Sequence, residues 1–554
     1  MNSKPTPALV AQGAAERLPR RPLLLLCAAY VLPGLIGRDP WRSSELTSFG
    51  VMLAMAEGRT AWFAPALGGV AVDAALLPHW IGAFFIWLFS PGLDPALAAR
   101  LPFAALLALT LVLTWYSAFH LARTEAAQPL PFAFGGEAST VDYARALADG
   151  ALLALMATLG ALQLGHETTP ELSQLCAAAL ALWALAAAPY RDWRPRLAAL
   201  AALPLLAASG APVMALAIGI AGSVICFRSH YPEVRRFAPW VVAGTLLSAL
   251  LALALHTWAW RIGPFGRQPQ WTQVTRLLLW FLWPAWLLAL WTLWRWRRQW
   301  QRRHITVPLA VAGTALAACI AMGGSDRALL VGLPGFAVLA AFALPTLRRS
   351  ASAAIDWFSV FFFTACALAI VVIYVSMQTG VPAKPLANIV KLAPGFEPRF
   401  SLPALLVALA GIAAWLALVR WRTGRHRQAI WKSLVLPAGG VALAWLLLMT
   451  LWLPLLDYAR GMRPWAARIA AQVPRGGCIA APGLAPSSVA ALEHHARARV
   501  DARASAQSTS ACAVLLLGET RGRALVVPAG WQVATRVRRP TERDEVTVVL
   551  RRAR

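Results

Sequence analysis

Acidic side chains that could do chemistry gather in two short polar stretches, each next to an apolar run. The first, "GRDPWRSSELTSF" from residue 37, holds Asp39 and Glu45, and the second, "GHETTPELS" from residue 165, holds His166 and Glu171. A carboxylate can accept the proton of an attacking hydroxyl group. An ionisable group beside lipid is costly, which favours a functional role. We therefore take Glu45, Asp39 and Glu171 as candidate catalytic residues, while Glu171 could also cap a helix and Asp39 could orient the turn before Pro40.

Cations that could bind an anion recur near the same predicted membrane face. They are Arg38, Arg42, Arg59, Arg261, Arg267, Arg327, Lys384, Lys391 and Arg399. Arginine forks bind phosphate well, so Arg59, Arg267 and Arg327 are the candidate phosphate ligands. Each arginine alone also suits an interfacial anchor. No zinc spacing, Walker motif or G-x-S-x-G sequence is present, and the adjacent pair His494–His495 is expected on a solvated helix face.

The elements that must position these residues are membrane helices. The chain of 554 residues is 59% hydrophobic and only 14% charged, with a mean hydropathy of +0.59. A soluble protein would carry roughly a quarter charged residues. About thirteen apolar runs approach the spanning length: 22–37, 99–119, 144–164, 172–189, 196–208, 211–227, 238–257, 275–294, 305–322, 328–346, 354–376, 402–419 and 433–454. The fold class expected is an α-helical polytopic membrane protein.

The basic residues set the expected topology. The net charge of +27 comes from arginines spread through short loops, so we interpret it as a topology signal rather than as a nucleic-acid site. If the apolar segment 74–90 does not cross, every basic cluster falls on one side, the cytoplasm. Residues 38–98 are then a first periplasmic loop with helices at 43–57 and 74–90 lying along the membrane. The N-terminus is expected inside, in a bacterial inner membrane.

A smaller domain is expected after the last span. The domain boundaries predicted are 1–456 for the membrane domain and 457–554 for a periplasmic α/β domain. Within the latter, 477–484, 512–518, 531–539 and 545–552 are typical of strands, and 487–497 is typical of a helix. Cys478 and Cys512 begin two of these strands, and neighbouring strands would bring them close enough for a disulfide.

The ordered motifs resemble the GT-C glycosyltransferases of the aminoarabinose transferase and protein O-mannosyltransferase superfamily. That family reads R-D-P-W-x-x-D-E, then E-K-P-P-L-x-x-W; this chain reads "RDPWRSSE" and "DAALLPHW". "ARLPFAALLALTLVL" (99–113), "GHETTPEL" and "LPLLDYARGMRP" resemble later family segments. The resemblance implies a GT-C fold of about thirteen transmembrane helices. It also implies substrate contacts from Asp73, Trp80 and His166.

The implied activity is transfer of a sugar from a polyprenyl-phosphate donor to an envelope acceptor at the periplasmic face, with inversion. The acceptor class is a lipid A-type glycolipid of lipopolysaccharide, another glycan or a protein. The expected partners are this lipid-linked sugar, membrane lipids and the acceptor; the metal requirement stays open. The family aspartate and lysine fall at Ser44 and Ala74. A catalytically degenerate relative that binds lipid-linked sugar, or serves in a complex, is therefore the alternative; a transporter would instead place its charges within the spans.

Overall fold

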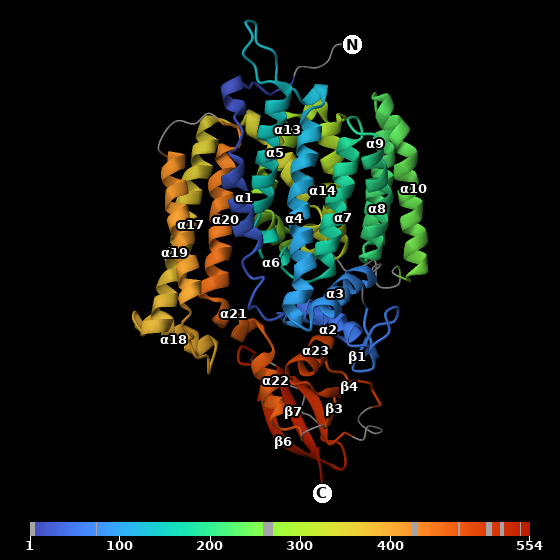
Figure 1. The fold of residues 1–554 in the computed structure, drawn as a ribbon, viewed down its shortest axis with the longest axis vertical. Helices are drawn as coiled ribbons and strands as arrows, with labels where there is room; N and C mark the ends of the chain where they lie inside the picture. Colours follow the sequence, from blue (N-terminus) through green and yellow to red (C-terminus); the bar gives the residue numbers. More distant parts are fainter. Residues whose placement is uncertain are drawn as a thin grey trace. The chain divides into compact units, whose positions relative to one another are not determined.

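The computed structural model describes most of the chain (Figure 1). The described residues are 6–41, 43–73, 75–256, 258, 270–423, 429–474, 477–505, 512–520, 526–542 and 545–553. By internal contacts the chain forms two compact units. Unit 1 comprises Met1–Pro33, Phe103–Leu368 and Leu406–Leu447, and unit 2 comprises Gly34–Pro102, Ala369–Leu405 and Leu448–Arg554.

Helices make up the part of unit 1 that the structure describes. They are α1 (Arg20–Val31), α5 (Thr140–Ala157), α6 (Gly160–Leu164), α7 (Pro170–Ala187), α8 (Trp193–Ala208), α9 (Pro212–Phe227), α10 (Pro232–Ala254), α12 (Trp271–Arg276), α13 (Ala285–Arg295), α14 (Arg303–Ala321), α15 (Asp326–Leu330) and α16 (Leu333–Ala343). Four longer helices belong to both units: α4 (Pro95–Ala122), α17 (Arg349–Thr379), α19 (Leu402–Thr423) and α20 (Lys432–Leu451). Each of the thirteen apolar runs predicted from the sequence overlaps one or more of the described helices, and the runs 144–164, 275–294 and 328–346 are divided between separate helical segments.

Seven of the described helices are long and apolar enough to cross a membrane, namely α4, α7, α10, α14, α17, α19 and α20. Helix α12 continues through a π-helical turn (Leu277–Phe281), and this segment meets α13 at a short break with a bend of 92°. The two would make an eighth span if they cross together. α2 (Ser44–Ala56) and α3 (Leu76–Phe89) are shorter apolar helices, which is compatible with their predicted place along the membrane surface. The total of thirteen spans, the orientation and the boundary at residue 457 stay predictions.

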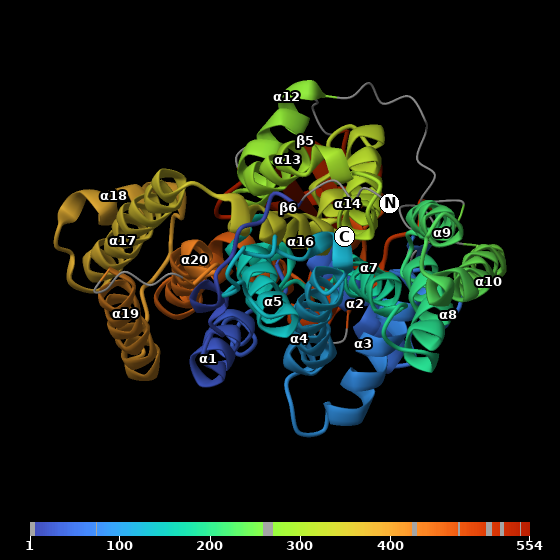
Figure 2. The ribbon, with the colours of Figure 1, turned by 90° about the horizontal axis from the view of Figure 1, so that it is seen from above.

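Local sequence explains where several helices begin. Pro170 and Pro212 occupy the first turn of α7 and α9, where a missing N–H costs nothing. The Ser139 hydroxyl accepts the backbone N–H of Asp142 and caps α5. Gly210, with φ +87°, makes the tight turn between α8 and α9. The hairpin predicted at "SGAP" is thus present, and Figure 2 shows α8, α9 and α10 side by side.

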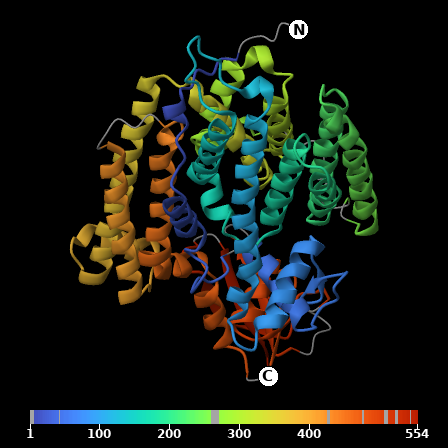
Figure 3. The ribbon, with the colours of Figure 1, turned by 45° about the horizontal axis from the view of Figure 1, so that its top comes forward.

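Unit 2 joins the first loop to the C-terminal segment. Helix α2 packs on α23 (Pro486–His495), and the contact is so close that a Cβ on Gly50 would clash with the Ala490 Cβ. The small hairpin of β1 (Ala66–Leu67) and β2 (Val70–Ala71) lies nearby, and its Gly68 carbonyl accepts the N–H of Ala502. Figure 3 shows the blue first loop beside the red C-terminal segment. Further helices of this unit are α18 (Ala383–Leu392), α21 (Leu453–Arg460) and α22 (Arg463–Ala470).

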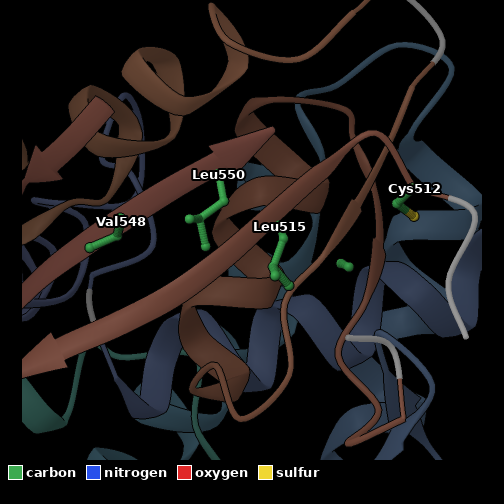
Figure 4. Packing of buried hydrophobic residues seen from close by; sticks show 5 residues of the cluster. Cys512, Leu515, Val548 and Leu550 are labelled. Carbon is green, nitrogen blue, oxygen red and sulfur yellow. The ribbon is translucent and has the colours of Figure 1, made fainter. Parts of the chain in front are cut away.

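The C-terminal segment forms a mixed five-stranded sheet in the order β4-β3-β5-β7-β6. Its strands are β3 (Cys478–Ala480), β4 (Arg499–Asp501), β5 (Val514–Thr520), β6 (Trp531–Arg538) and β7 (Glu545–Arg552). Strand β3 pairs in parallel with β4 and β5, and β7 pairs antiparallel with β5 and β6. Leu515, Val548 and Leu550 bury their side chains on this sheet (Figure 4). The α/β class expected for this segment is confirmed.

Two details of this segment can be compared with the sequence predictions. Cys478 and Cys512 form a disulfide with 4.9 Å between their Cα atoms, which confirms the pairing expected from adjacent strands. The solvated face expected for His494 and His495 is wrong. Both are only partly exposed, and the His494 ring packs at 4.8 Å from the Phe49 ring because α23 faces α2.

Candidate functional site

The "RDPW" stretch and the first turn of α2 position the first charged group of the site. Glu45 lies in that turn, and its Oε2 accepts the backbone N–H of Trp41 at 3.0 Å. Arg38 donates to both carboxylate oxygens, from Nη1 to Oε2 at 2.8 Å and from Nη2 to Oε1 at 2.5 Å. The side chains of Arg38 and Glu45 are each 1% exposed. Such a bidentate pair fixes the loop geometry as well as the charge.

The surroundings of Glu45 keep it ionised. Burial opposes ionisation, but the charges of Arg38 and Arg100 and the hydrogen bonds from Arg38 and Trp41 outweigh it and lower the pKa of Glu45. A carboxylate with a lowered pKa and two occupied oxygens is a weak proton acceptor. The contacts therefore give Glu45 the features of a positioning residue.

Arg100 adds positive charge to the same place. It lies in α4, only 4% of its surface is exposed, and its Nε is 3.9 Å from Glu45 Oε1. Among the described residues, its Nε and Nη2 have no hydrogen-bond partner. An incompletely paired buried guanidinium is costly, and it makes the surrounding potential positive.

A second carboxylate pair lies beside the first. Arg463 donates two hydrogen bonds to the Asp39 carboxylate, from Nε to Oδ2 at 2.8 Å and from Nη2 to Oδ1 at 2.5 Å. Burial acts against the Asp39 anion, but Arg463 more than offsets it and lowers the pKa of Asp39. The backbone N–H of Asp39 faces both oxygens of Asp457 at 3.3 Å. Asp39 and Asp457 therefore approach each other closely although 418 positions separate them.

Asp457 differs from the other two acids. No arginine forms a salt bridge with it among the described residues, and its Oδ1 accepts the indole N–H of Trp41 at 2.8 Å. Burial, together with the nearby negative charge of Asp39, raises the pKa of Asp457 to about 7. The side chain remains partly exposed. A carboxyl group that titrates near neutrality suits general acid–base chemistry.

Trp41 organises the cluster. The guanidinium carbons of Arg38 and Arg460 lie 4.7 and 5.1 Å from its ring centroid, respectively, which is cation–π range. We call this group the first-loop cluster, which comprises Arg38, Asp39, Trp41, Glu45, Arg100, Asp457, Arg460 and Arg463. Among the described residues it holds four arginines against three acids, and such a grouping makes the local potential favourable for an anion.

A second group lies within unit 1. Arg327 bridges two acids, with Nη2 at 2.9 Å from Glu167 Oε2 and Nη1 at 3.1 Å from Glu171 Oε2. Glu167 also accepts a hydrogen bond from Gln163 at 2.8 Å. We call Glu167, Glu171 and Arg327 the Arg327 cluster. The predicted arginine and the predicted acid therefore do meet here.

His166 lies in a structural setting in unit 1. Its Nε2 is 2.7 Å from the Tyr30 carbonyl and its Nδ1 is 2.7 Å from the Leu162 carbonyl. Its ring contacts Tyr30 edge-on and lies tilted against Trp445, at centroid distances of 5.3 and 4.6 Å. Whether it also contacts a substrate stays a prediction.

The other predicted residues that the structure describes are not members of the first-loop cluster. Arg59 pairs with Glu57 at 2.6 Å and with Glu493 of α23 at 2.5 Å, so it already has two acidic partners. Asp73 is exposed. The indole N–H of Trp80 binds the Trp62 carbonyl at 2.8 Å. Arg267 lies outside the described residues, as does Ala74 at the family lysine position.

Sequence reasoning missed Asp457, Arg100, Arg460 and Arg463. The signal was present in "LPLLDYARGMRP", where an acid and two arginines follow the last apolar run at intervals of three. In the part of the chain that the structure describes, no group of three or more His, Cys, Asp or Glu residues is placed to hold a metal ion.

The comparisons with known proteins agree with this architecture. No protein-family model and no curated protein matches the sequence. The structure is similar to that of ArnT from Cupriavidus metallidurans bound to undecaprenyl phosphate, with a TM-score of 0.60 and 12% identity over 96% of this chain and 97% of that chain. ArnT in the apo state gives a TM-score of 0.59 and 13% identity over 95% and 96%. The chain thus has the ArnT fold over nearly its whole length, and the fold that the resemblance implied is confirmed.

Proposed function

We propose that the chain is a membrane glycosyltransferase that transfers a sugar from a polyprenyl-phosphate donor to an envelope acceptor. The ArnT fold supports this proposal, because one of the similar structures holds undecaprenyl phosphate. The observation that carries it is local. A carboxyl group with a pKa of about 7, Asp457, is held among four arginines in the first-loop cluster. That arrangement combines a proton acceptor with positive charge for a phosphate.

The chemistry assigns each part a task. An acceptor hydroxyl attacks the anomeric carbon, its oxygen forms the new glycosidic bond, and the bond to the donor phosphate oxygen breaks. Asp457 takes the hydroxyl proton, and the polyprenyl phosphate leaves with its negative charge. A single displacement of this kind inverts the anomeric centre. Preorganised cations stabilise the charge that develops on the leaving group.

The arginines divide between structure and ligand binding. Arg38 is committed to Glu45, so Glu45 holds the loop and with it Trp41 and Asp457. Arg463 binds Asp39 but is 64% exposed at its side chain, and Arg460 is exposed, so both are the proposed contacts of a phosphate that binds at this surface. The buried guanidinium of Arg100, beside Glu45, adds to the positive potential of the cluster. The donor-phosphate contacts predicted from the sequence at Arg59, Arg267 and Arg327 stay predictions.

The proposed roles of the acidic residues differ from those expected from the sequence. Glu45 was the expected base, with help from Asp39, and that prediction stays open to test. The bonding of Glu45 favours Asp457 as the base, with Asp39 tuning it. Glu171 and Arg327 form a second ligand-binding group, for which the sugar or the acceptor is the proposed partner.

The proposed membrane orientation places residues 38–98 and the segment 457–554 outside, with the N-terminus inside. Reporter fusions after residue 95 and after residue 460 are both expected to report the periplasm. A cytoplasmic report at residue 95 would contradict this orientation and remove the first-loop cluster from the outer face.

The activity test is transfer of radiolabelled sugar from a polyprenyl-phosphate donor in membranes that contain the full chain. Wild-type protein is expected to transfer, and Asp457→Asn is expected to lose most of the activity. Asp192→Asn, an exposed acid in a different loop, is the matched control. The absence of transfer by wild type across a panel of donors and acceptors would overturn the proposed activity.

A second candidate function is binding of the lipid-linked sugar without transfer. The replacement of the family aspartate and lysine by Ser44 and Ala74 favours it. Under this alternative, wild type retains a polyprenyl-phosphate sugar on purification and releases it unhydrolysed and untransferred. Transfer by wild type that depends on Asp457 would exclude it.

A further inference from the structure

A groove on unit 1 has the composition of a lipid site. It occupies ≈ 640 Å³ between α1, α4 and α5, the three neighbouring helices that Figure 2 shows from above. Its floor and walls are apolar over most of their area, with Leu24, Leu32 and Val112 among the lining residues. Those three side chains are also exposed, so the groove opens toward the lipid that would surround the helices.

Charged side chains gather at one end of this groove. Arg17, Arg20, Arg145 and Asp149 line that end, which lies at the start of α1. Arg17 is paired with Asp142 at 2.8 Å. Asp149 is buried, and its two oxygens accept the N–H of Leu18 and the indole N–H of Trp115. Neither Arg20 nor Arg145 has an ion-pair partner among the described residues.

The dimensions fit a lipid of one leaflet. From Arg20 to Leu32 the groove follows α1 for twelve residues, or roughly 18 Å at the rise of an α-helix. Half of the hydrocarbon core of a bilayer is about 15 Å thick. The cations therefore lie one acyl-chain length from the far end of the apolar lining. An anionic headgroup at the cations and a single acyl chain along α1 would fill this groove.

We propose that this groove binds an anionic phospholipid, with its phosphate held by Arg20 and Arg145 and an acyl chain lying between α1, α4 and α5. Charge complementarity favours an anionic headgroup. Arg20 and Arg145 supply two positive charges at this end of the groove, and the carboxylate there, Asp149, already accepts two hydrogen bonds from N–H groups. The length selects an ordinary acyl chain over a long polyprenyl chain. This site is distinct from the first-loop cluster, because Arg20 and Arg38 stand at opposite ends of the first apolar run.

The experiment compares lipids retained by the full-length protein. Protein is equilibrated in nanodiscs of phosphatidylcholine with a minor fraction of phosphatidylglycerol, extracted gently, and its bound lipids are counted by native mass spectrometry. Wild type is expected to retain phosphatidylglycerol in preference to phosphatidylcholine. The double variant Arg20→Gln/Arg145→Gln is expected to lose that preference by roughly 5–30-fold, the order expected for removing one or two arginines from an anionic headgroup.

Two further variants guard against indirect effects. Arg194→Gln/Arg228→Gln removes two exposed arginines elsewhere in unit 1 and is expected to leave the preference unchanged. Ala28→Trp fills the groove and is expected to lower retention of both lipids. Equal preference in wild type and the Arg20/Arg145 variant would overturn the proposal. Retention of added polyprenyl phosphate in place of phosphatidylglycerol would also overturn it.

Discussion

The two charged clusters differ in how their arginines and acids are paired. In the first-loop cluster four arginines face three acids, and one of those acids, Asp457, has a pKa of about 7. In the Arg327 cluster one guanidinium serves two carboxylates. The first arrangement gathers several arginines around Trp41 and is suited to a phosphate. The second holds two carboxylates, which can accept hydrogen bonds from hydroxyl groups of a substrate. The comparison thus assigns different ligands to the two clusters.

A second contrast lies within the first-loop cluster. The Glu45 side chain is buried and both of its oxygens accept hydrogen bonds from Arg38. The Asp457 side chain is partly exposed and accepts hydrogen bonds from neutral N–H groups. Ion pairing holds the pKa of Glu45 down, while burial and Asp39 raise the pKa of Asp457. Carboxylates in one cluster can therefore divide into one that holds the loop and one that exchanges protons.

The largest effect is expected from Asp457→Asn. If Asp457 is the base, sugar transfer falls by roughly 10²–10⁴-fold, the usual contribution of general-base catalysis. The amide can still accept the indole N–H of Trp41, so the variant is expected to remain folded. Initial rates from the radiolabelled donor, with thermal unfolding of the same samples, give the measurement. Unchanged rates would remove Asp457 from the mechanism.

The next effect concerns stability. Glu45→Gln leaves Arg38 and Arg100 buried without their anion, and breaking a buried pair costs about 3–5 kcal/mol. We therefore expect a markedly lower unfolding temperature. Because the pKa of Glu45 is lowered, its contribution to stability is present above the pKa of the unfolded chain and is lost as the pH falls through the folded pKa.

A double-mutant cycle with Arg38→Gln sharpens this test. The two changes are expected to cost much less together than their sum, since the second removes the charge that the first leaves unpaired. A Glu45→Gln protein of normal stability that has lost transfer would instead restore Glu45 as the base.

The sequence sufficed for much of the fold because its signals are local. Each predicted apolar run overlaps one or more helices, and short apolar segments predicted four of the five C-terminal strands that the structure describes. Strand β4 (Arg499–Asp501) was not predicted, because two of its three residues are charged. Only part of the site could be predicted from the sequence. The RDPW stretch is a continuous motif, whereas the contact between Asp457 and Trp41 joins residues 416 positions apart. The packing of His494 on Phe49 was hidden for the same reason.

A smaller effect is expected in the Arg327 cluster. Arg327→Gln removes the cation that bridges Glu167 and Glu171. If this cluster binds the sugar or the acceptor, the KM for that substrate is expected to rise by roughly 10–100-fold, as expected for one charge-assisted hydrogen bond. Arg399→Gln, an exposed arginine expected at the same membrane face, is the control. A change in the KM for acceptor alone would assign this cluster to the acceptor.

The smallest effect is a shift in pH dependence. Transfer by wild type is expected to rise with pH through about 7, because Asp457 must be ionised to accept a proton. Asp39→Asn removes the anion that raises the pKa of Asp457 and releases Arg463 from its partner. Both changes favour the Asp457 anion, so the rising limb moves to lower pH by roughly half to one unit, equivalent to about 1 kcal/mol.

The reverse change supplies the control for that shift. Arg463→Gln removes a cation from the surroundings of Asp39 and Asp457, so the rising limb is expected to move to higher pH. A loss of structure alone would lower the rate in both variants without moving the limb in opposite directions. The pair therefore separates electrostatic tuning of Asp457 from damage to the loop. If the limb stays in place in both variants, the group that titrates lies outside the first-loop cluster, and the Arg327 cluster becomes the place to look for the base.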